Sequence, residues 1–309
     1  MNIVFMGTPD YAVKTLEAVI NAGHNVSAVF AQPDKPVGRK HILTAPPVKE
    51  CALAHNIPVF QPQTLRNTET VELIKSFEPD VIVVVAYGKI LREDVLNIPK
   101  LACVNGHASL LPKYRGSAPI QWSIINGEKV TGVTTMLMDK GIDTGDILEQ
   151  TKVKIGEEET AEELFERLSV VSAELMVSTL AKLSKGEITP IKQTESDATY
   201  APIIKKEMAQ IDFNKTATEI HNAVRGYYSW PCAFFFFEGK RIKVISAVVG
   251  ENTSKPAGTV IKSTDALCIA CGNNTSIEIT YLQAEGSKPM SAKQFLCGKS
   301  IPQGTVVGE

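Results

Sequence analysis

The stretch "DVIVVVA", residues 80–86, decides the fold class of this chain because its apolar residues run without interruption. A strand with one solvent-exposed face alternates apolar and polar residues, whereas an unbroken run of valine and isoleucine is typical of a strand that is buried on both faces. Strands of that kind form parallel sheets with helices packed on each side. We therefore expect residues 80–86 to lie inside an α/β sheet.

The segments before and after this strand alternate between strand and helix patterns. We expect further strands at residues 2–6, 25–32, 101–108, 130–138 and 147–155. We expect helices at residues 11–23, 47–56 and 159–186. The last helix is the clearest, because Thr160 and Glu163 form a capping-box pattern at its start and Gly186 stops it. The alternation predicts a doubly wound, mostly parallel, Rossmann-like sheet with its site at the carboxyl ends of the strands.

The pattern changes after this helix. Residues 190–206 are polar, contain proline and show no periodicity, which indicates a linker. A helix at residues 216–227 is followed by short strands with glycine breaks, at residues 232–237, 241–249, 258–263, 267–272 and 276–283. Such strands predict a small β-barrel of the oligonucleotide-binding (OB) type. We expect an α/β domain at residues 1–189 and an OB-like domain at residues 207–309.

Composition and charge are those of an ordinary globular protein. The chain has 309 residues, and no apolar run approaches the roughly 20 residues that a membrane-spanning helix needs. The N-terminus has a strand pattern in place of a signal peptide, so we expect a cytoplasmic protein with no membrane partner. Residues 1–204 carry 20 Lys and Arg against 25 Asp and Glu (net −5), and residues 205–309 carry 12 against 9 (net +3). The basic second part fits a polyanionic partner or ordinary solvated surface equally well.

Motifs for dinucleotides, ATP and structural metals are missing. Residues 6–12, "MGTPDYA", follow the first strand without forming G-x-G-x-x-G, and no G-x-x-x-x-G-K-[ST] occurs. Both absences disfavour a dehydrogenase and an ATPase. Cys268 and Cys271 form a C-x-x-C pair, but none of the five histidines lies within 40 residues of it. We therefore expect no metal, and six reduced, partly buried thiols.

Three polar residues predict a catalytic centre for attack on a carbonyl. Asn105 and His107 lie two residues apart on one strand, so their side chains share a face and supply an amide donor and a titratable imidazole. Asp143, in the glycine-flanked turn "DKGIDTGD", can orient the imidazole and accept protons. A structural histidine and an Asx turn are the alternatives. Because G-x-S-x-G is absent, direct transfer to an external nucleophile fits better than a covalent acyl-enzyme.

The ordered motifs of the chain resemble the folate-dependent formyltransferases. Asn-x-His is followed by "SLLP" (109–112), "RGSAPIQ" (115–121) and "MDKGIDTGDIL" (138–148). The resemblance runs along the whole chain through "FMGTPDYA", "QPDKPVGR" with "PPVK", "VVVAYGKIL" and "IDF…IHNAVRGYYSWPCAFF". One departure is Gly106, where the family usually has an aliphatic residue; a side chain there would face away from the site.

The resemblance implies a co-substrate, an acceptor and a set of site residues. It implies that the N-terminal domain binds 10-formyltetrahydrofolate and that Asn105, His107 and Asp143 are catalytic. It implies that the segment with Ser109, Leu110, Leu111 and Pro112 binds the folate, with Tyr87 and Gly88 in the pterin pocket. From the residues alone, Leu110, Leu111 and Pro112 would present apolar surface to a flat ligand, and Lys113 and Arg115 could meet an anion or remain solvated. The acceptor implied is the amino group of methionine on initiator tRNA, bound by a monomeric protein.

Two basic segments are candidates for the tRNA contact. Residues 31–49 form a long loop in a domain of short connections, and Lys35, Arg39 and Lys40 make it basic. The resemblance implies that this loop binds the acceptor end of the tRNA. In the second domain, Lys240, Arg241 and Lys243 follow a hairpin turn at residues 238–239, where alternation places Arg241 and Lys243 on one face.

Three other functions fit parts of the sequence. A formyltransferase acting on a small amine, such as glycinamide ribonucleotide or an amino sugar nucleotide, would use the same catalytic residues, but residues 207–309 and the basic loop speak against glycinamide ribonucleotide. A non-catalytic RNA-binding protein would bind folate without turnover. A hydrolase would release formate without any acceptor.

Overall fold

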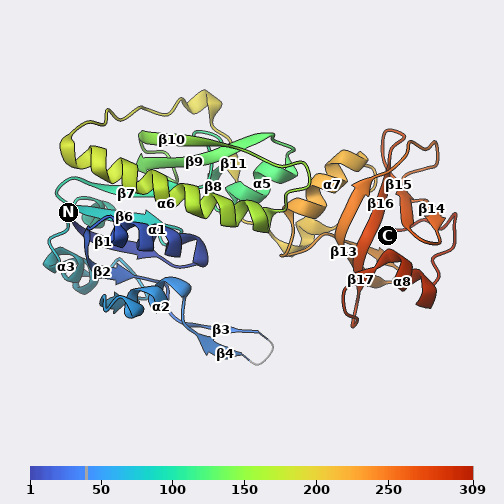
Figure 1. Cartoon of the computed structure of the whole chain (residues 1–309), viewed down its shortest axis with the longest axis horizontal. Helices are drawn as coiled ribbons and strands as arrows, with labels where there is room; N and C mark the ends of the chain where they lie inside the picture. The colour runs from blue at the N-terminus through green and yellow to red at the C-terminus, as the bar shows by residue number, and fades with distance from the viewer. Residues whose placement is uncertain (39–40, 309) are drawn as a thin grey trace. The chain divides into compact units, whose positions relative to one another are not determined.

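A computed structural model of the chain describes residues 1–38 and 41–308 (Figure 1). The chain divides into two compact units. Unit 1 comprises Met1–Pro119, Val130–Lys154 and Phe165–Ala201. Unit 2 comprises Ile120–Lys129, Ile155–Leu164 and Pro202–Glu309. Each unit contains a β-sheet of its own (Figure 1).

Unit 1 is built on a seven-stranded sheet with the order β10-β9-β7-β6-β1-β2-β5. Its strands are β1 Asn2–Gly7, β2 Asn25–Phe30, β5 Val59–Phe60, β6 Val81–Val85, β7 Ala102–His107, β9 Val130–Leu137 and β10 Ile147–Lys154. The pairs from β5 to β7 are parallel, whereas β9 is antiparallel to both of its neighbours. All five residues of β6 are buried. The predicted mostly parallel α/β sheet is confirmed, and Val81–Val85 are covered on both faces, whereas Ala86 after the strand is exposed.

Within the described residues, six helices precede residue 186. They are α1 Asp10–Asn21, α2 Pro47–Ala54, α3 Thr68–Ser76, α4 Glu93–Leu96, α5 Pro119–Ile125 and α6 Ala161–Lys185. Helix α5 lies almost entirely in unit 2, and α6 begins in unit 2 and continues in unit 1. At the start of α6 the Thr160 amide donates to the Glu163 carboxylate at 2.8 Å, and the Glu163 amide donates back to Thr160 Oγ1 at 3.3 Å. Gly186 follows the helix with a φ of +68°. The capping box and the glycine stop predicted from the sequence are both present.

The prediction that residues 31–49 form a long loop is wrong over much of its length. A two-stranded hairpin, β3 Lys35–Val37 and β4 Ile42–Thr44, occupies the segment (Figure 1). A second short pair joins β8 Arg115–Gly116 to β11 Tyr200–Ala201, so part of the predicted linker at residues 190–206 is attached to the sheet unit. Strands of two or three residues are too short to show an alternation, and the sequence could not reveal them.

Unit 2 contains a curled antiparallel sheet in the order β12-β13-β16-β15-β14, with β17 paired to β16 (Figure 1). Its strands are β12 Phe234–Phe237, β13 Lys240–Val249, β14 Val260–Ser263, β15 Leu267–Ala270, β16 Ser276–Ala284 and β17 Met290–Ser291, and its helices are α7 Ala217–Gly226 and α8 Ala292–Gly298. Glu238 and Gly239 have φ values of +50° and +69° and form the predicted turn between β12 and β13. The strands are confirmed; their assignment to an OB-type barrel stays a prediction.

The cysteines are free thiols with unequal exposure. Cys103, Cys232, Cys268 and Cys271 are buried, and Cys297 is exposed. Burial raises the pKa of the Cys103 and Cys271 thiols to about 12, so both are unreactive as nucleophiles near neutral pH. Within the described residues, no group of three His, Cys, Asp or Glu side chains could hold a metal ion. In the same residues, no helix is long and apolar enough to cross a membrane.

Gly106 and Gly116 differ in what a side chain would meet. A Cβ at Gly106 would lie 3.1 Å from Ser172 Oγ and 3.4 Å from Met176 Cε, both on α6, so the space needs only a small adjustment. A Cβ at Gly116 would lie 2.8 Å from the Ala201 carbonyl oxygen, at a φ of +116°. Only glycine fits there without moving backbone.

We predict that Gly106→Ala changes the free energy of unfolding by less than about 1 kcal/mol. Alanine loses less conformational entropy on folding than glycine, and this gain offsets the close contact of the new methyl group with α6. Gly116→Ala should destabilise the protein by at least about 2 kcal/mol, since both the φ and the contact oppose it. Urea unfolding of the two variants measures the difference. Equal losses would contradict these placements.

Candidate functional site

The structure brings together the three residues that the sequence proposes as catalytic. Asn105 Nδ2 lies 3.5 Å from Asp143 Oδ1, and His107 Nδ1 lies 3.5 Å from Asp143 Oδ2. The first two come from the end of β7, and Asp143 comes from the turn between β9 and β10. Because β9 is antiparallel to β7, this turn leaves the sheet beside Cys103, where the Met138 amide donates to its carbonyl at 2.9 Å. The turn therefore folds back to bring its carboxylate to the pair.

The His107 ring has one defined orientation. Its side chain is almost completely buried, and Nε2 donates to the Tyr114 carbonyl oxygen at 2.9 Å. A carbonyl can only accept, so Nε2 carries a hydrogen in either charge state. The other nitrogen, Nδ1, faces Asp143 and receives the second proton when the ring becomes a cation. Nδ1 is therefore the ring nitrogen that faces the carboxylate.

Asp143 is held by a neighbouring loop. The Gly116 amide donates to Asp143 Oδ2 at 2.8 Å, and the Asp143 backbone has a φ of +54°. A left-handed conformation is unfavourable by about 1–2 kcal/mol for a residue with a side chain. Aspartate tolerates this conformation better than most residues, and an Asx turn alone does not describe it, because its carboxylate lies near His107 and Asn105.

The predicted folate-binding segment is held from β9 and β10. Thr134 Oγ1 donates to the Ser109 carbonyl at 2.7 Å and accepts from the Leu111 amide at 3.1 Å. Gln150 Nε2 donates to the Leu111 carbonyl at 2.8 Å. Leu111 is buried, so its side chain does not present surface to a ligand as the sequence suggested; Leu110 and Pro112 are partly exposed. Sequence reasoning missed Thr134 and Gln150, because nothing in a strand pattern marks them.

Arg115 neither meets an external anion nor is solvated, so both alternatives predicted for it from the sequence are wrong. The side chain is 1% exposed. Its Nε donates to Gln193 Oε1 at 3.1 Å, and its Nη1 forms an ion pair with Glu195 at 2.9 Å. Lys113, by contrast, is exposed. Arg115 therefore serves to join its loop to the segment that was predicted as a linker.

Tyr87 lies in the apolar core of unit 1. It is 1% exposed, and its hydroxyl finds no hydrogen-bond partner among the described residues. Burial raises the pKa of this phenol well above its usual value. Its carbonyl accepts from Thr8 Oγ1 at 3.1 Å and from Gln32 Nε2 at 3.0 Å, and Gly88 follows with a φ of +82°. Tyr87 thus anchors this turn through its buried ring and its carbonyl, and the ring contributes no exposed surface.

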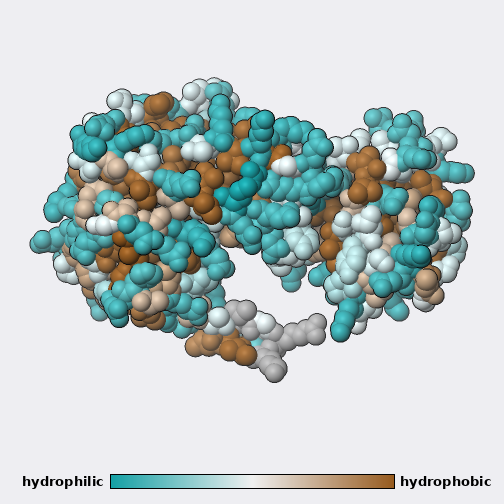
Figure 2. Space-filling model, in the orientation of Figure 1, coloured by the Kyte–Doolittle hydropathy of each residue, from teal (hydrophilic) through white to brown (hydrophobic). Residues whose placement is uncertain are grey.

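The β3–β4 hairpin presents both charge and apolar surface. Lys35 is exposed on β3, whereas Arg39 and Lys40, the other two predicted tRNA contacts, lie outside the described residues. Ile42 and Leu43 on β4 are 62% and 66% exposed. Figure 2 shows this apolar surface in brown beside the grey atoms. An exposed apolar patch of this kind is typical of a surface that contacts a partner.

Two basic residues of unit 2 line a common hollow. Arg241 and Lys243 border a cavity of about 430 Å³ on β13, and the Arg241 guanidinium lies 4.5 Å from the centre of the Phe234 ring. Lys240, which alternation places on the other face, is not part of this lining. The side chains of Arg241 and Lys243 therefore lie on one face of the sheet and border the same cavity.

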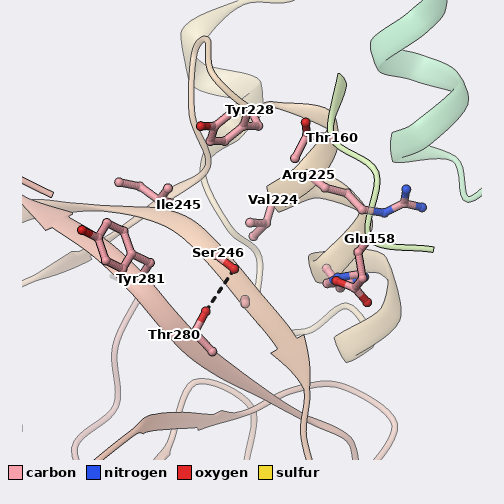
Figure 3. A pocket seen from close by; sticks show the side chains of 11 residues that line it. Glu158, Thr160, Val224, Arg225, Tyr228, Ile245, Ser246, Thr280 and Tyr281 are labelled. Atoms are coloured by element: carbon pink, nitrogen blue, oxygen red, sulfur yellow. Dashed lines mark hydrogen bonds and ion pairs between the residues drawn. The ribbon is translucent and has the colours of Figure 1, made fainter. Parts of the chain in front are cut away.

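A second cavity of unit 2, of about 520 Å³, lies between α7, β13 and β16 (Figure 3). Glu158 forms an ion pair with His221 at 3.0 Å on its rim. Thr280 Oγ1 donates to Ser246 Oγ at 3.0 Å across two strands (Figure 3). The lining therefore combines hydroxyl groups with a charged pair.

Arg225 in the wall of this cavity is committed to the protein. Its Nη1 donates to the carbonyls of Gly156 at 3.2 Å and Glu159 at 3.0 Å, and Nε and Nη2 donate to Asn222 Oδ1. The residue is 6% exposed, and burial lowers the pKa of its guanidinium. Arg225 joins Gly156 and Glu159 to α7 within unit 2 and is a structural cation.

Comparison with known families identifies the class of protein. A family model described as formyl transferase matches residues 1–180, and a model described as formyl transferase, C-terminal domain, matches residues 203–300. The chain belongs to the formyl transferase family.

Curated relatives match over the full length. The methionyl-tRNA formyltransferase of Alkaliphilus oremlandii is 47% identical over 311 residues and is covered completely, as is this chain. The methionyl-tRNA formyltransferase of Clostridium novyi is 49% identical over 304 residues, which cover 97% of this chain and 98% of that protein.

Solved structures show the same fold at lower identity. An N-formyltransferase from Helicobacter canadensis, in complex with folinic acid and dTDP-3-aminofucose, is 21% identical with a TM-score of 0.68, covering 91% of this chain and 98% of that one. HypX from Aquifex aeolicus, in complex with tetrahydrofolic acid, is 17% identical with a TM-score of 0.61, covering 95% of this chain and 46% of that one.

We predict that Thr134→Val lowers the free energy of unfolding by about 2 kcal/mol, because it leaves the Leu111 amide and the Ser109 carbonyl without their buried partner. Thr280→Val is the matched control, since its hydroxyl makes one bond on an exposed face; we expect a loss below about 0.5 kcal/mol. Denaturant unfolding compares the two. If both variants lost the same stability, Thr134 would not hold the segment.

Proposed function

We propose that this chain transfers the formyl group of 10-formyltetrahydrofolate to the amino group of methionine on initiator tRNA. The proposed reaction is supported by the convergence of Asn105, His107 and Asp143 in a formyl transferase fold. The proposed acceptor is supported by the full-length similarity to proteins named methionyl-tRNA formyltransferase. The product would be N-formylmethionyl-tRNA, which serves translation initiation.

In the proposed reaction the neutral amine of methionine attacks the formyl carbon on N10 of the folate. The carbonyl electrons move to oxygen, and the resulting oxyanion accepts hydrogen bonds from Asn105 Nδ2 and from Nδ1 of the His107 cation. Nδ1 is the nitrogen for this role, because Nε2 is bound to the Tyr114 carbonyl. The 3.5 Å separations from Asp143 exceed those of charge-assisted hydrogen bonds, so neither donor is committed to a short bond with this carboxylate before the reacting oxygen arrives.

Asp143 has two tasks in this proposal. Its carboxylate balances the charge of the His107 cation, and it accepts the proton that the amine loses on attack. As the oxyanion collapses, the bond from carbon to N10 breaks, and N10 receives that proton. Tetrahydrofolate then leaves, and the carboxylate is regenerated.

The binding roles follow from the same proposal. The backbone of Ser109, Leu110, Leu111 and Pro112 would hold the folate, with the turn at Tyr87 and Gly88 bordering the pterin. Lys35, with Arg39 and Lys40, would contact the acceptor end of the tRNA. Arg241 and Lys243 would contact its phosphates, which is supported by their common hollow.

The domain assignment also belongs to the proposal. Residues 1–189 would be the catalytic domain, residues 190–206 its connection, and residues 207–309 an OB-like tRNA-binding domain. The curled antiparallel sheet of unit 2 supports the last point. We expect a cytoplasmic monomer.

We predict that Asn105→Ala, His107→Ala and Asp143→Ala each lower kcat by about 100-fold or more, since the loss of one oxyanion donor typically removes about 3 kcal/mol of transition-state stabilisation. Steady-state formylation assays measure the rates, and circular dichroism checks that each variant folds. Near-normal rates in all three would refute the assignment.

The acceptor is tested by incubating the protein and 10-formyltetrahydrofolate with charged initiator tRNA, charged elongator methionine tRNA, an amino sugar nucleotide, or no acceptor. We expect formyl transfer to the initiator tRNA at a rate at least about tenfold above the elongator, a ratio that corresponds to about 1.4 kcal/mol. Transfer to the sugar alone would indicate the small-acceptor alternative. Release of formate without an acceptor would indicate a hydrolase, and folate binding without turnover would indicate a non-catalytic protein.

A further inference from the structure

Gln193 connects the two loops that meet at the candidate active site. Its Nε2 donates to the Asp143 carbonyl at 2.8 Å and to the Gly145 carbonyl at 2.7 Å. Its Oε1 accepts from Arg115 Nε at 3.1 Å. Carbonyls only accept and the Arg115 nitrogen only donates, so these partners determine which end of the amide faces which loop. One side chain thus binds the Asp143 turn and the loop that carries Gly116.

The turn around Asp143 has a reason to need this bond. Asp143 adopts a left-handed backbone, which unrestrained residues avoid. Its carboxylate is correctly placed only if the turn and the Gly116 amide keep their relative position, because Gly116 donates to Oδ2 at 2.8 Å. Gln193 holds the turn through two carbonyls and holds Arg115, the residue before Gly116, through its guanidinium.

The same segment of chain also supports the partner of His107. The Tyr114 amide donates to Thr199 Oγ1 at 2.9 Å, and the Arg115 amide donates to the Thr199 carbonyl at 2.8 Å. Tyr114 in turn provides the carbonyl that orients the imidazole. Residues 191–201 therefore brace both the carboxylate and the imidazole, although the sequence pattern described them as a linker.

We propose that Gln193 is a positioning residue that sets the location of the Asp143 carboxylate relative to His107. It touches no reacting atom and acts through the backbone of the turn. This inference rests on the proposed function for its kinetic consequence, whereas its structural consequence is independent of substrate.

Two variants separate the bonds that Gln193 makes. Gln193→Glu keeps an acceptor for Arg115 but has no N–H for the carbonyls of Asp143 and Gly145. Gln193→Ala removes both connections. Thr194→Ala is the matched control. Thr194 follows Gln193 directly, is exposed, and its side chain makes no capping hydrogen bond to the short helix that begins at Glu195.

We expect both Gln193 variants to lower kcat about 10- to 100-fold, as a displacement near 1 Å of a catalytic group does. The KM values for folate and tRNA should stay within about threefold, because the variants leave the binding residues in place. Thr194→Ala should retain the wild-type kcat. Wild-type kcat in Gln193→Glu, or a loss carried by KM in place of kcat, would overturn the proposal.

A measurement without substrate makes the test independent of the proposed reaction. The full-length chain with 15N-labelled glycine reports the Gly116 amide, which donates to the Asp143 carboxylate. We expect a shifted resonance and faster hydrogen exchange of this amide in both Gln193 variants, and no change in Thr194→Ala. An unchanged Gly116 amide in both would overturn the inference even if the wild type formylates tRNA. If the wild type fails to formylate, the changed amide would still support it.

Discussion

The candidate site depends on one carboxylate that is held between two loops. Asp143 accepts from the Gly116 amide at 2.8 Å while it faces His107 and Asn105 at 3.5 Å. Gly116 can stand there only as glycine, because the Ala201 carbonyl occupies the space of a side chain. Asn105 and His107 share strand β7, whereas Asp143 lies in a turn six residues beyond the end of β9, so the position of its carboxylate depends on the contacts of that turn. The short β8–β11 pair is what keeps this loop in place.

The sheet explains why the polar groups meet where they do. The buried strand β6 pairs in parallel with β7, so both strands end on the same side of the sheet. Asn105 and His107 lie at this carboxyl end of β7. The reversed β9 then supplies Thr134, which holds the predicted folate segment, and the turn that carries Asp143. Because β9 runs against β7, its end lies beside Cys103, and the turn folds back from there to place Asp143 near Asn105 and His107. The site therefore uses β9 as well as the parallel strands.

Sequence reasoning predicted the strands, the long capped helix and the three polar residues because each leaves a local trace. An unbroken valine run, a Thr160–Glu163 pair and an Asn-x-His spacing are all visible without coordinates. It failed where structure depends on distant partners. Sequence patterns alone predict a loop at the β3–β4 hairpin, an accessible Arg115 and an exposed Leu111, and all three predictions are wrong because pairing and burial are decided by what packs against a residue.

The sequence by itself determined the fold class, since apolar periodicity is a property of the chain alone, and its ordered motifs indicated the formyltransferase family. Only the tertiary structure decided which nitrogen of His107 faces Asp143, because that follows from the Tyr114 carbonyl on another loop. Only it showed that residues 191–201 brace the site, because hydrogen bonds between residues 50 positions apart, such as Gln193 and Asp143, leave no pattern in the sequence.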